Sequence, residues 1–227
     1  MIRCDLHVHS CLSPCAEDEM TPFDLVGMAK LNGLDLIALT DHNSVKNCRA
    51  AAAAAAEYKI GFLPGMELNT SEEIHCICLF PTVEAAEDFG RYVDGIMPAI
   101  PNRPEFFGNQ TWFEPDGTPH TEKRYLHPAC DISILDVPAL CAEYGGVCWP
   151  AHVDRPSNGL LAVLGTWPPE LNVRAAEVRF VTPPEVPDGL HIIQASDAHR
   201  MEDMPDGGFL LRPNEPTFAA LKAWLET

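Results

Sequence analysis

The sequence predicts an α/β fold whose largely parallel sheet curves into an incomplete barrel. Short apolar runs of strand length alternate with helical segments along the chain. Apolar residues make up 46% of the 227 residues and charged residues 21%, which is typical of a folded domain and not of a disordered chain or a coiled coil. Seven strand candidates favour a barrel-like sheet over an open one.

The strand candidates are apolar runs bounded by turn residues. They are residues 2–9, 34–40, 60–66, 74–80, 146–151, 175–181 and 190–195. The first predicted helix spans residues 22–31, with Thr21 as N-cap, Pro22 at the first helical position and Gly33 as the stop. Ser44 is expected to cap a second helix that runs through the alanine stretch to Tyr58, because alanine is the strongest helix former. The remaining predicted helices are residues 82–96, 133–144 and 217–225.

Residues 98–128 break this rhythm. They are rich in proline and polar residues, and the segment Glu114-Pro115-Asp116-Gly117 is a strong turn signal between strand candidates at 110–113 and 123–126. We expect a hairpin-bearing insertion within a single domain that covers residues 1–227.

Charge and composition exclude several classes of function. The chain has 15 Lys plus Arg against 33 Asp plus Glu, a formal charge of −18, which disfavours binding to nucleic acid or to an anionic membrane. No apolar run approaches the roughly 18 residues of a membrane span, and Arg3 and Asp5 interrupt any signal-peptide core. The nine cysteines are odd in number, and Cys76 and Cys78 alternate in an apolar run, so we expect reduced thiols and a cytoplasmic protein.

Side chains that can bind metal ions lie on one face of the first predicted strand and directly after four others. Because the carboxyl ends of parallel strands meet at one edge of a sheet, we expect these side chains to converge. They are Asp5, His7 and His9; Asp41 and His42; Glu67; His152; and Asp197 and His199. Imidazoles mixed with carboxylates favour Zn²⁺, Mn²⁺ or Fe²⁺ over Mg²⁺ or Ca²⁺, and so many ligands imply two or three ions.

Four histidines do not follow this pattern. His75 begins its apolar run instead of ending it, so either that strand runs in the opposite sense or His75 is structural. His120 and His127 belong to the insertion and its flank and are expected at the surface. His191 opens an apolar strand and is expected to be a core or edge residue.

Three motifs combine histidines with carboxylates: Asp5-Leu6-His7-Val8-His9-Ser10, Thr40-Asp41-His42 and Ser196-Asp197-Ala198-His199. Together with Glu67, His75 and His152, they resemble the PHP (polymerase and histidinol phosphatase) superfamily from end to end of the chain. The resemblance implies a distorted (β/α)₇ barrel, a di- or trinuclear metal centre and phosphoesterase activity. It also implies a ligand set for each ion: His7, His9, Glu67 and Asp197 for the first; Glu67, His75 and His152 for the second; His42 and His199 for the third. The third ion needs one more ligand from the loop after His9, either Cys15 or Glu17. We favour Glu17, because an oxygen ligand keeps the site hydrolytic and tolerant of air.

The same comparison suggests roles around the ligands. Asp5 and Asp41 are expected to accept hydrogen bonds from the far nitrogens of liganded imidazoles. Arg155 and Arg200 follow ligand positions and are expected to hold a substrate phosphate. With Glu67 and Asp197 as further catalytic carboxylates, the sequence predicts a metal-dependent phosphoesterase acting on a small phosphorylated metabolite or nucleotide. The alternatives are an amidohydrolase-type C–N hydrolase and a non-catalytic metal-binding regulatory domain.

Overall fold

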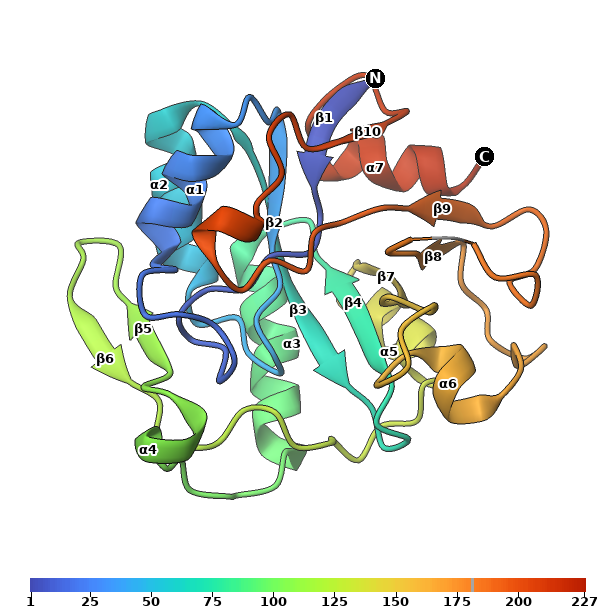
Figure 1. Cartoon of the computed structure of the whole chain (residues 1–227), viewed down its shortest axis with the longest axis horizontal. Helices are drawn as coiled ribbons and strands as arrows, with labels where there is room; N and C mark the ends of the chain where they lie inside the picture. The colour runs from blue at the N-terminus through green and yellow to red at the C-terminus, as the bar shows by residue number, and fades with distance from the viewer. Residues whose placement is uncertain (181) are drawn as a thin grey trace.

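A curled central sheet organises the computed structural model, which describes residues 1–180 and 182–227 (Figure 1). Within these residues the sheet has six strands in the order β10-β1-β2-β3-β4-β7. The strands are β1 (Ile2–Asp5), β2 (Leu36–Leu39), β3 (Gly61–Asn69), β4 (His75–Leu79), β7 (Val147–Pro150) and β10 (Phe209–Leu211). A separate parallel pair, β8 (Ala175–Glu177) and β9 (His191–Ile193), lies beside β7. Strand β10 was not predicted from the sequence.

The direction of β4 resolves the question about His75. Strands β1, β2 and β3 run parallel, whereas β4 pairs with β3 antiparallel and places His75 opposite Asn69. Strand β7 runs antiparallel to β4 and therefore parallel to β3. Because β4 is reversed, its first residue lies at the same edge of the sheet as the last residues of its neighbours.

The predicted helices are present, and four of them begin later than expected: by one residue for those at 82–96 and 217–225, and by three or four residues for the helix after Ser44 and the one at 133–144. The helices are α1 (Pro22–Leu31), α2 (Cys48–Tyr58), α3 (Val83–Ile96), α4 (Pro104–Phe107), α5 (Val137–Glu143), α6 (Leu160–Leu164) and α7 (Phe218–Leu225). Thr21, Thr82 and Thr217 accept capping hydrogen bonds at the starts of α1, α3 and α7. Ser44 does not cap α2, which begins later, after Asn47. The short helices α4 and α6 were not predicted, and no helix of the described residues is long and apolar enough to cross a membrane.

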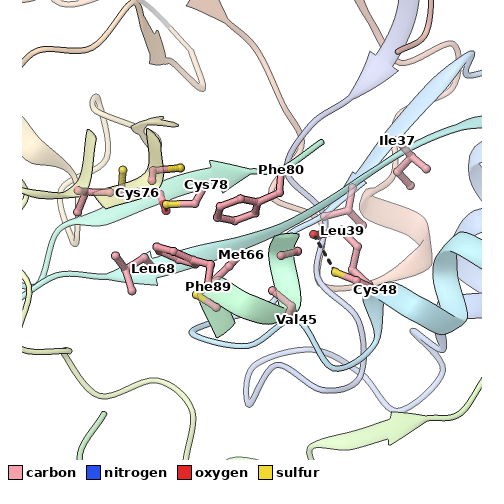
Figure 2. Packing of buried hydrophobic residues seen from close by; sticks show 14 of the residues in the cluster. Ile37, Leu39, Val45, Cys48, Met66, Leu68, Cys76, Cys78, Phe80 and Phe89 are labelled. Atoms are coloured by element: carbon pink, nitrogen blue, oxygen red, sulfur yellow. Dashed lines mark hydrogen bonds between the residues drawn. The ribbon is translucent and has the colours of Figure 1, made fainter. Parts of the chain in front are cut away.

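Two hydrophobic layers fill the two faces of the sheet. Alternation along each strand sends neighbouring residues to opposite faces, so Ile37 and Leu39 pack under α1–α3 and α5, while Leu36 and Ala38 face the interior of the curl. Figure 2 shows the helix-covered layer, in which Phe80, directly after β4, packs against Phe89 of α3 with ring centroids 4.8 Å apart. Leu221 and Leu225 of α7 close the inner layer.

The curled sheet forms half of a barrel. Among the described residues, β8 and β9 are a pair of their own and not part of the six-stranded sheet. The chain after β9 nevertheless returns to β1, where Val8 and Ala198 form an isolated parallel bridge. The sequence prediction of a strand at 175–181 extends to residue 181, which lies outside the described residues, and β8 ends at Glu177.

The insertion contains the expected hairpin in a tighter form. Strands β5 (Thr111–Phe113) and β6 (Pro119–Thr121) pair antiparallel and stand at the lower left of Figure 1. The predicted second strand at 123–126 was wrong. The second strand begins earlier because the turn is short. The Gly117 amide donates to the Glu114 carbonyl, and the Glu114 amide donates to the Thr118 carbonyl.

Candidate metal centre

Eight candidate ligands gather at one edge of the sheet. Residues His7 and His9 follow β1, His42 follows β2, Glu67 lies within β3, His75 begins β4, His152 follows β7, and Asp197 and His199 follow β9. Seven of them are buried, and the His199 side chain is 22% exposed. Strand ends from both halves of the chain therefore meet in one polar cluster, as the sequence indicated.

The first group of ligands consists of His7, His9, Glu67 and Asp197. The Nε2 atoms of His7 and His9 face each other at 3.0 Å. Glu67 Oε1 lies 3.2 Å from His7 Nε2 and Glu67 Oε2 lies 3.3 Å from His9 Nε2, while Asp197 Oδ1 lies 3.3 Å from both nitrogens. Two imidazole nitrogens and two carboxylates thus converge on one point.

The second group shares Glu67 with the first. Its Oε1 atom lies 2.9 Å from His75 Nδ1 and 3.1 Å from His152 Nε2. One carboxylate therefore stands between two sets of imidazoles, which is the arrangement of a bridging ligand.

The third group is formed by His9, His42 and His199, and it shares His9 with the first group. The His9 and His199 rings stack with centroids 4.2 Å apart. Cys15 Sγ lies 3.3 Å from His42 Nε2 and extends this group toward the solvent.

Glu17 does not join the third group. Its side chain is half exposed and its Oε1 lies 3.2 Å from Arg200 Nε. The structure therefore places Cys15, and not the Glu17 that we favoured, beside the histidines. The pairing also engages Arg200, one of the two arginines expected to hold phosphate.

His127 is a candidate ligand that the sequence analysis assigned to the surface. Its ring nitrogens lie close enough to those of His42 and His75 for the three to share an ion. The end of the insertion is held over the site, because Asn69 Nδ2 donates to the His127 carbonyl and Asn43 Nδ2 donates to the Leu126 carbonyl. The signal in the sequence was the position of His127 at the close of the insertion, where the chain returns to the sheet.

The polar atoms of the cluster fit a cation. His42 Nδ1 and Glu67 Oε2 are buried and lie 2.9 Å apart, but they do not meet with the geometry of a hydrogen bond. Buried polar atoms without a well-formed hydrogen bond cost free energy, which a shared cation would offset. The donor set of imidazoles with a few carboxylates suits a divalent transition metal.

The pKa shifts of the ligand side chains also indicate a site for positive charge. Burial would lower the pKa of His7, but the carboxylates of Glu177, Glu67 and Asp197 raise it well above its usual value. Burial would raise the pKa of Glu67, but the surrounding imidazoles, His75 foremost, hold it well below its usual value. These buried carboxylates therefore require positive charge beside them, from protons or from metal ions.

Three carboxylates hold the ligand-bearing segments in place, but neither Asp5 nor Asp41 accepts a hydrogen bond directly from an imidazole, which was the role expected of them. Asp41 reaches His9 through Ser13, whose hydroxyl donates to Asp41 Oδ1 and lies 2.9 Å from His9 Nδ1. Asp5 does not contact an imidazole: its Oδ1 accepts from the backbone amides of Ser196 and His7. The expected role of Asp5 is filled instead by a residue that the sequence analysis did not single out.

That residue is Glu177, at the end of β8. Its two oxygens lie 2.9 and 3.2 Å from His7 Nδ1, and Oε1 also accepts from the backbone amide of His152. The sequence signal was faint, because a carboxylate ends an otherwise apolar strand with no histidine beside it.

The cluster opens into a pocket of about 330 Å³. Its lining residues are Cys15, His42, Glu67, His75, His127, Arg155, Asn158, Asp197, His199 and Arg200. Arg155 Nη1 lies 2.6 Å from Asp197 Oδ2, and Arg179 Nη1 approaches the same oxygen at 3.7 Å. Both predicted arginines therefore line the pocket, and Arg179 is a third cation beside Asp197.

Two proteins of known activity share part of this sequence. A 3',5'-nucleoside bisphosphate phosphatase from Chromobacterium violaceum is 39% identical over 77 residues, which cover 34% of this chain and 26% of that protein. A 5'-3' exoribonuclease from Haemophilus influenzae is 35% identical over 78 residues, which cover 33% of this chain and 27% of that protein. The matched segments thus span about a quarter of the length of these relatives.

Comparisons of structure and of family agree with these matches. A lesion-specific endonuclease from Pyrococcus furiosus shares the fold, with a TM-score of 0.68 and 16% identity over 99% of this chain and 56% of that one. The model of the PHP domain matches residues 5–126, just over half of the chain. The resemblance drawn from the histidine motifs is therefore confirmed, and the chain belongs to the PHP family.

Proposed function

We propose that this chain is a metal-dependent phosphoric-ester hydrolase. The observation that carries the proposal is the set of overlapping ligand groups, joined by Glu67 and open to a pocket with Arg155 and Arg200 at its wall. A site that neutralises several negative charges beside a cavity suits an anionic phosphate ester. Membership of the PHP family and the named activities of the two partial relatives support this reading.

Each ligand group would hold one ion. His7, His9, Glu67 and Asp197 would hold the first, and Glu67, His75 and His152 the second. His9, His42 and His199 lie around the third position, where we propose Cys15 in place of Glu17 as the additional ligand. Two to three ions of Zn²⁺, Mn²⁺ or Fe²⁺ fit these donors, because Mg²⁺ and Ca²⁺ prefer shells of oxygen alone.

The residues around the ions would have separate roles in hydrolysis. When bound, such ions activate water as a nucleophile and neutralise the charge on the phosphoryl oxygens. Glu67 and Asp197 supply the negative charge that keeps cations together, while Glu177, Asp41 and Asp5 fix the histidine-bearing segments. Arg155 is placed to turn a terminal phosphate toward the ions by a charge-assisted hydrogen bond.

The substrate class is proposed as a small phosphate monoester, including nucleotides. A formal charge of −18 opposes the approach of a long polyanion, and a bisphosphate phosphatase is among the partial relatives. A second candidate is a phosphodiester at the end of a nucleic acid. It is favoured by the exoribonuclease relative and by the endonuclease that shares the fold.

A substrate screen tests the proposal. Metal-loaded protein is assayed on phosphomonoesters, on 3',5'-bisphosphates, on short single-stranded oligoribonucleotides and on amide substrates, with a Glu67→Gln variant as control. Phosphate release that is lost in the variant supports the monoesterase, and shortening of the oligoribonucleotide supports the diesterase. Turnover of amides alone would replace both with C–N hydrolysis, and no turnover of any substrate would favour a regulatory role.

We further propose that residues 1–227 form one PHP-like domain with residues 98–128 inserted, built on a distorted seven-stranded barrel. The supporting feature is the return of the chain after β9 to β1. There the Asp197 amide donates to the His7 carbonyl, and the His9 amide donates to the Ala198 carbonyl. On the other side, the Val153 amide after β7 donates to the Glu177 carbonyl of β8. The barrel would thus consist of seven strands, β1, β2, β3, β4, β7, β8 and β9. It would be closed by only a few hydrogen bonds between β7 and β8 and between β9 and β1.

A further inference from the structure

The end of the insertion places aromatic side chains beside the metal centre. Residues 123–125 run alongside residues 100–102, and Pro101 forms an isolated antiparallel bridge with Arg124. Beyond this bridge Leu126 is buried, whereas Tyr125 and His127 on either side of it are partly exposed. This alternation indicates that the Tyr125 and His127 side chains project to the same side, away from the core.

Three aromatic rings at this place share one orientation. The Tyr125 and Phe107 rings stack with centroids 3.9 Å apart and planes at 20°. The Tyr125 and His127 rings are also near parallel, at 16°, with centroids 6.2 Å apart. The His127 ring meets the His42 ring edge-on, with centroids 4.7 Å apart. Phe107, Tyr125 and His127 therefore form an aromatic wall that leads outward from the metal centre.

Buried amide side chains fix the backbone of the aromatic wall. Asn43 Nδ2 donates to the carbonyls of Leu126 and Pro128. Gln110 Oε1 accepts from the Leu126 amide, and Gln110 Nε2 donates to the Arg124 carbonyl. Both of these amide side chains are buried. The rings are thus held in place before a ligand arrives, which lowers the entropic cost of binding one.

The outer part of the aromatic wall is separate from the hydrophobic core. Within the described residues, neither Phe107 nor Tyr125 belongs to the two layers that cover the sheet, although the neighbouring Leu126 does. Phe106, next to Phe107, is 70% exposed. Aromatic rings left open at the mouth of a polar pocket are typical of ligand sites, which combine apolar walls with a few polar groups.

The pocket and the aromatic wall suit different parts of one ligand. Arg155 and Arg200 line the pocket and suit a phosphate. The wall suits a planar ring, because aromatic rings pack well in parallel, offset arrangements. His127 belongs to both, since it lines the pocket and forms the inner end of the wall. A ligand that fits both parts carries a phosphate and a planar ring on one short frame, as a nucleoside phosphate does.

We propose that the aromatic wall is a base-binding subsite, so that the substrate is a nucleoside phosphate whose base lies parallel to the Tyr125 and His127 rings. This inference rests on the proposed phosphoesterase function, because the phosphate is held at the metal centre. Every base has a π-face that can stack on an aromatic ring. The subsite therefore accepts different bases, and purines, with the larger face, bind best.

A matched pair of ligands tests the role of the base. Adenosine 5'-monophosphate and ribose 5-phosphate have the same sugar and phosphate and differ only in the base. Both are assayed with metal-loaded protein, by KM for phosphate release and by calorimetric Kd for a ligand that is not hydrolysed. We expect the adenosine compound to bind at least about 5-fold more tightly, the lower end of what one base gains by stacking on an aromatic side chain.

Variants locate the base on the aromatic wall. Tyr125→Leu keeps an apolar side chain but removes the ring. It should raise the KM or Kd for adenosine 5'-monophosphate at least about 5-fold, with unchanged kcat and unchanged binding of ribose 5-phosphate. Tyr125→Phe keeps the ring and should behave like the unaltered chain. Tyr92→Leu, at an exposed tyrosine of α3, is the matched control, and thermal unfolding checks that each variant is folded.

The outcomes separate the base subsite from the phosphoesterase activity. Equal binding of the two ligands by the unaltered chain would overturn the subsite even if both are hydrolysed. So would a Tyr125→Leu variant that binds both ligands normally or loses both equally. Tight binding of phenyl phosphate, at the level of adenosine 5'-monophosphate, would overturn the nucleoside and assign the wall to aryl phosphates. Binding that needs both the base and Tyr125, without hydrolysis of any phosphate ester, would support the subsite and refute the phosphoesterase.

Discussion

Replacing Glu177 by Gln should weaken metal binding without unfolding the chain. The Glu177 side chain is 2% exposed and holds His7 Nδ1 with both oxygens, at 2.9 and 3.2 Å. The same carboxylate accepts the His152 amide at 3.2 Å. One side chain therefore orients one expected ligand and fixes the backbone of another, in two different ligand groups.

The size of the effect follows from these contacts. Glutamine has the same shape and keeps an oxygen for the His7 N–H, but it removes the negative charge that makes the imidazole a stronger donor to a cation. Partners of this kind are worth roughly 10- to 100-fold in metal affinity, or about 1.4–2.7 kcal/mol. Glu177→Ala should cost more, because the buried His152 amide then loses its partner, at about 1–3 kcal/mol of folding stability.

Graded chelation measures this directly. Metal-loaded Glu177→Gln and unaltered protein are dialysed against increasing chelator, and residual metal is counted by elemental analysis. Thermal unfolding of the metal-free proteins separates binding from folding. Glu170→Gln, at an exposed carboxylate, is the matched control. If Glu177→Gln and the control release metal at the same chelator concentration, Glu177 does not orient the ligands.

Three further substitutions test the centre itself. Glu67→Gln should leave the fold intact but remove more than one ion per chain, because an amide cannot balance two cations; full metal content by elemental analysis would refute the bridge. Arg155→Ala should lower kcat/KM on the best phosphate ester about 10- to 100-fold, by loss of a charge-assisted contact worth ~1.5–3 kcal/mol, with metal content unchanged and partial rescue by Arg155→Lys. Unchanged kinetics of Arg155→Ala would show that Arg155 has only a structural role beside Asp197. Cys15→Ser should abolish the sulfur-to-metal charge-transfer band of the cobalt-substituted protein, whereas Glu17→Gln should keep it; the reverse result would make Glu17 the ligand.

The sequence was most informative about elements with local signals. Helix α1 was predicted to the residue, because Thr21 and Pro22 define its start through hydrogen bonding and fixed φ. The start of α2 was missed, since no side chain caps it and the alanines alone extend the pattern in both directions. Strand β10 has three residues and pairs antiparallel with β1 from the far end of the chain. Strand β10 forms because of this long-range pairing, which the hydrophobic periodicity of the sequence cannot predict.

The candidate site was predictable where chemistry and strand ends coincide. His7, His9, His42 and Asp197 were expected together from that rule. His75 obeyed it only once β4 was known to run in the opposite sense, which is a property of sheet pairing. Glu177 and His127 were not predicted as site residues, because their roles depend on tertiary contacts. The Glu177 carboxylate packs behind His7, and His127 lies where the chain returns from the insertion to the sheet.

The choice between Cys15 and Glu17 illustrates what residue spacing cannot decide. Counting forward from His9 and backward from Thr21 selects different residues, because both counts assume a regular path through the loop. The loop instead makes two successive turns, in which the Ser13 amide donates to the Ser10 carbonyl and the Ala16 amide to the Ser13 carbonyl. The Glu17 amide then donates to the His199 carbonyl, so the Glu17 backbone is anchored at the metal centre. Its side chain nevertheless leaves the centre for Arg200, while Cys15 points to His42. Proximity of the backbone is shared by both residues, and only the direction of the side chain separates them.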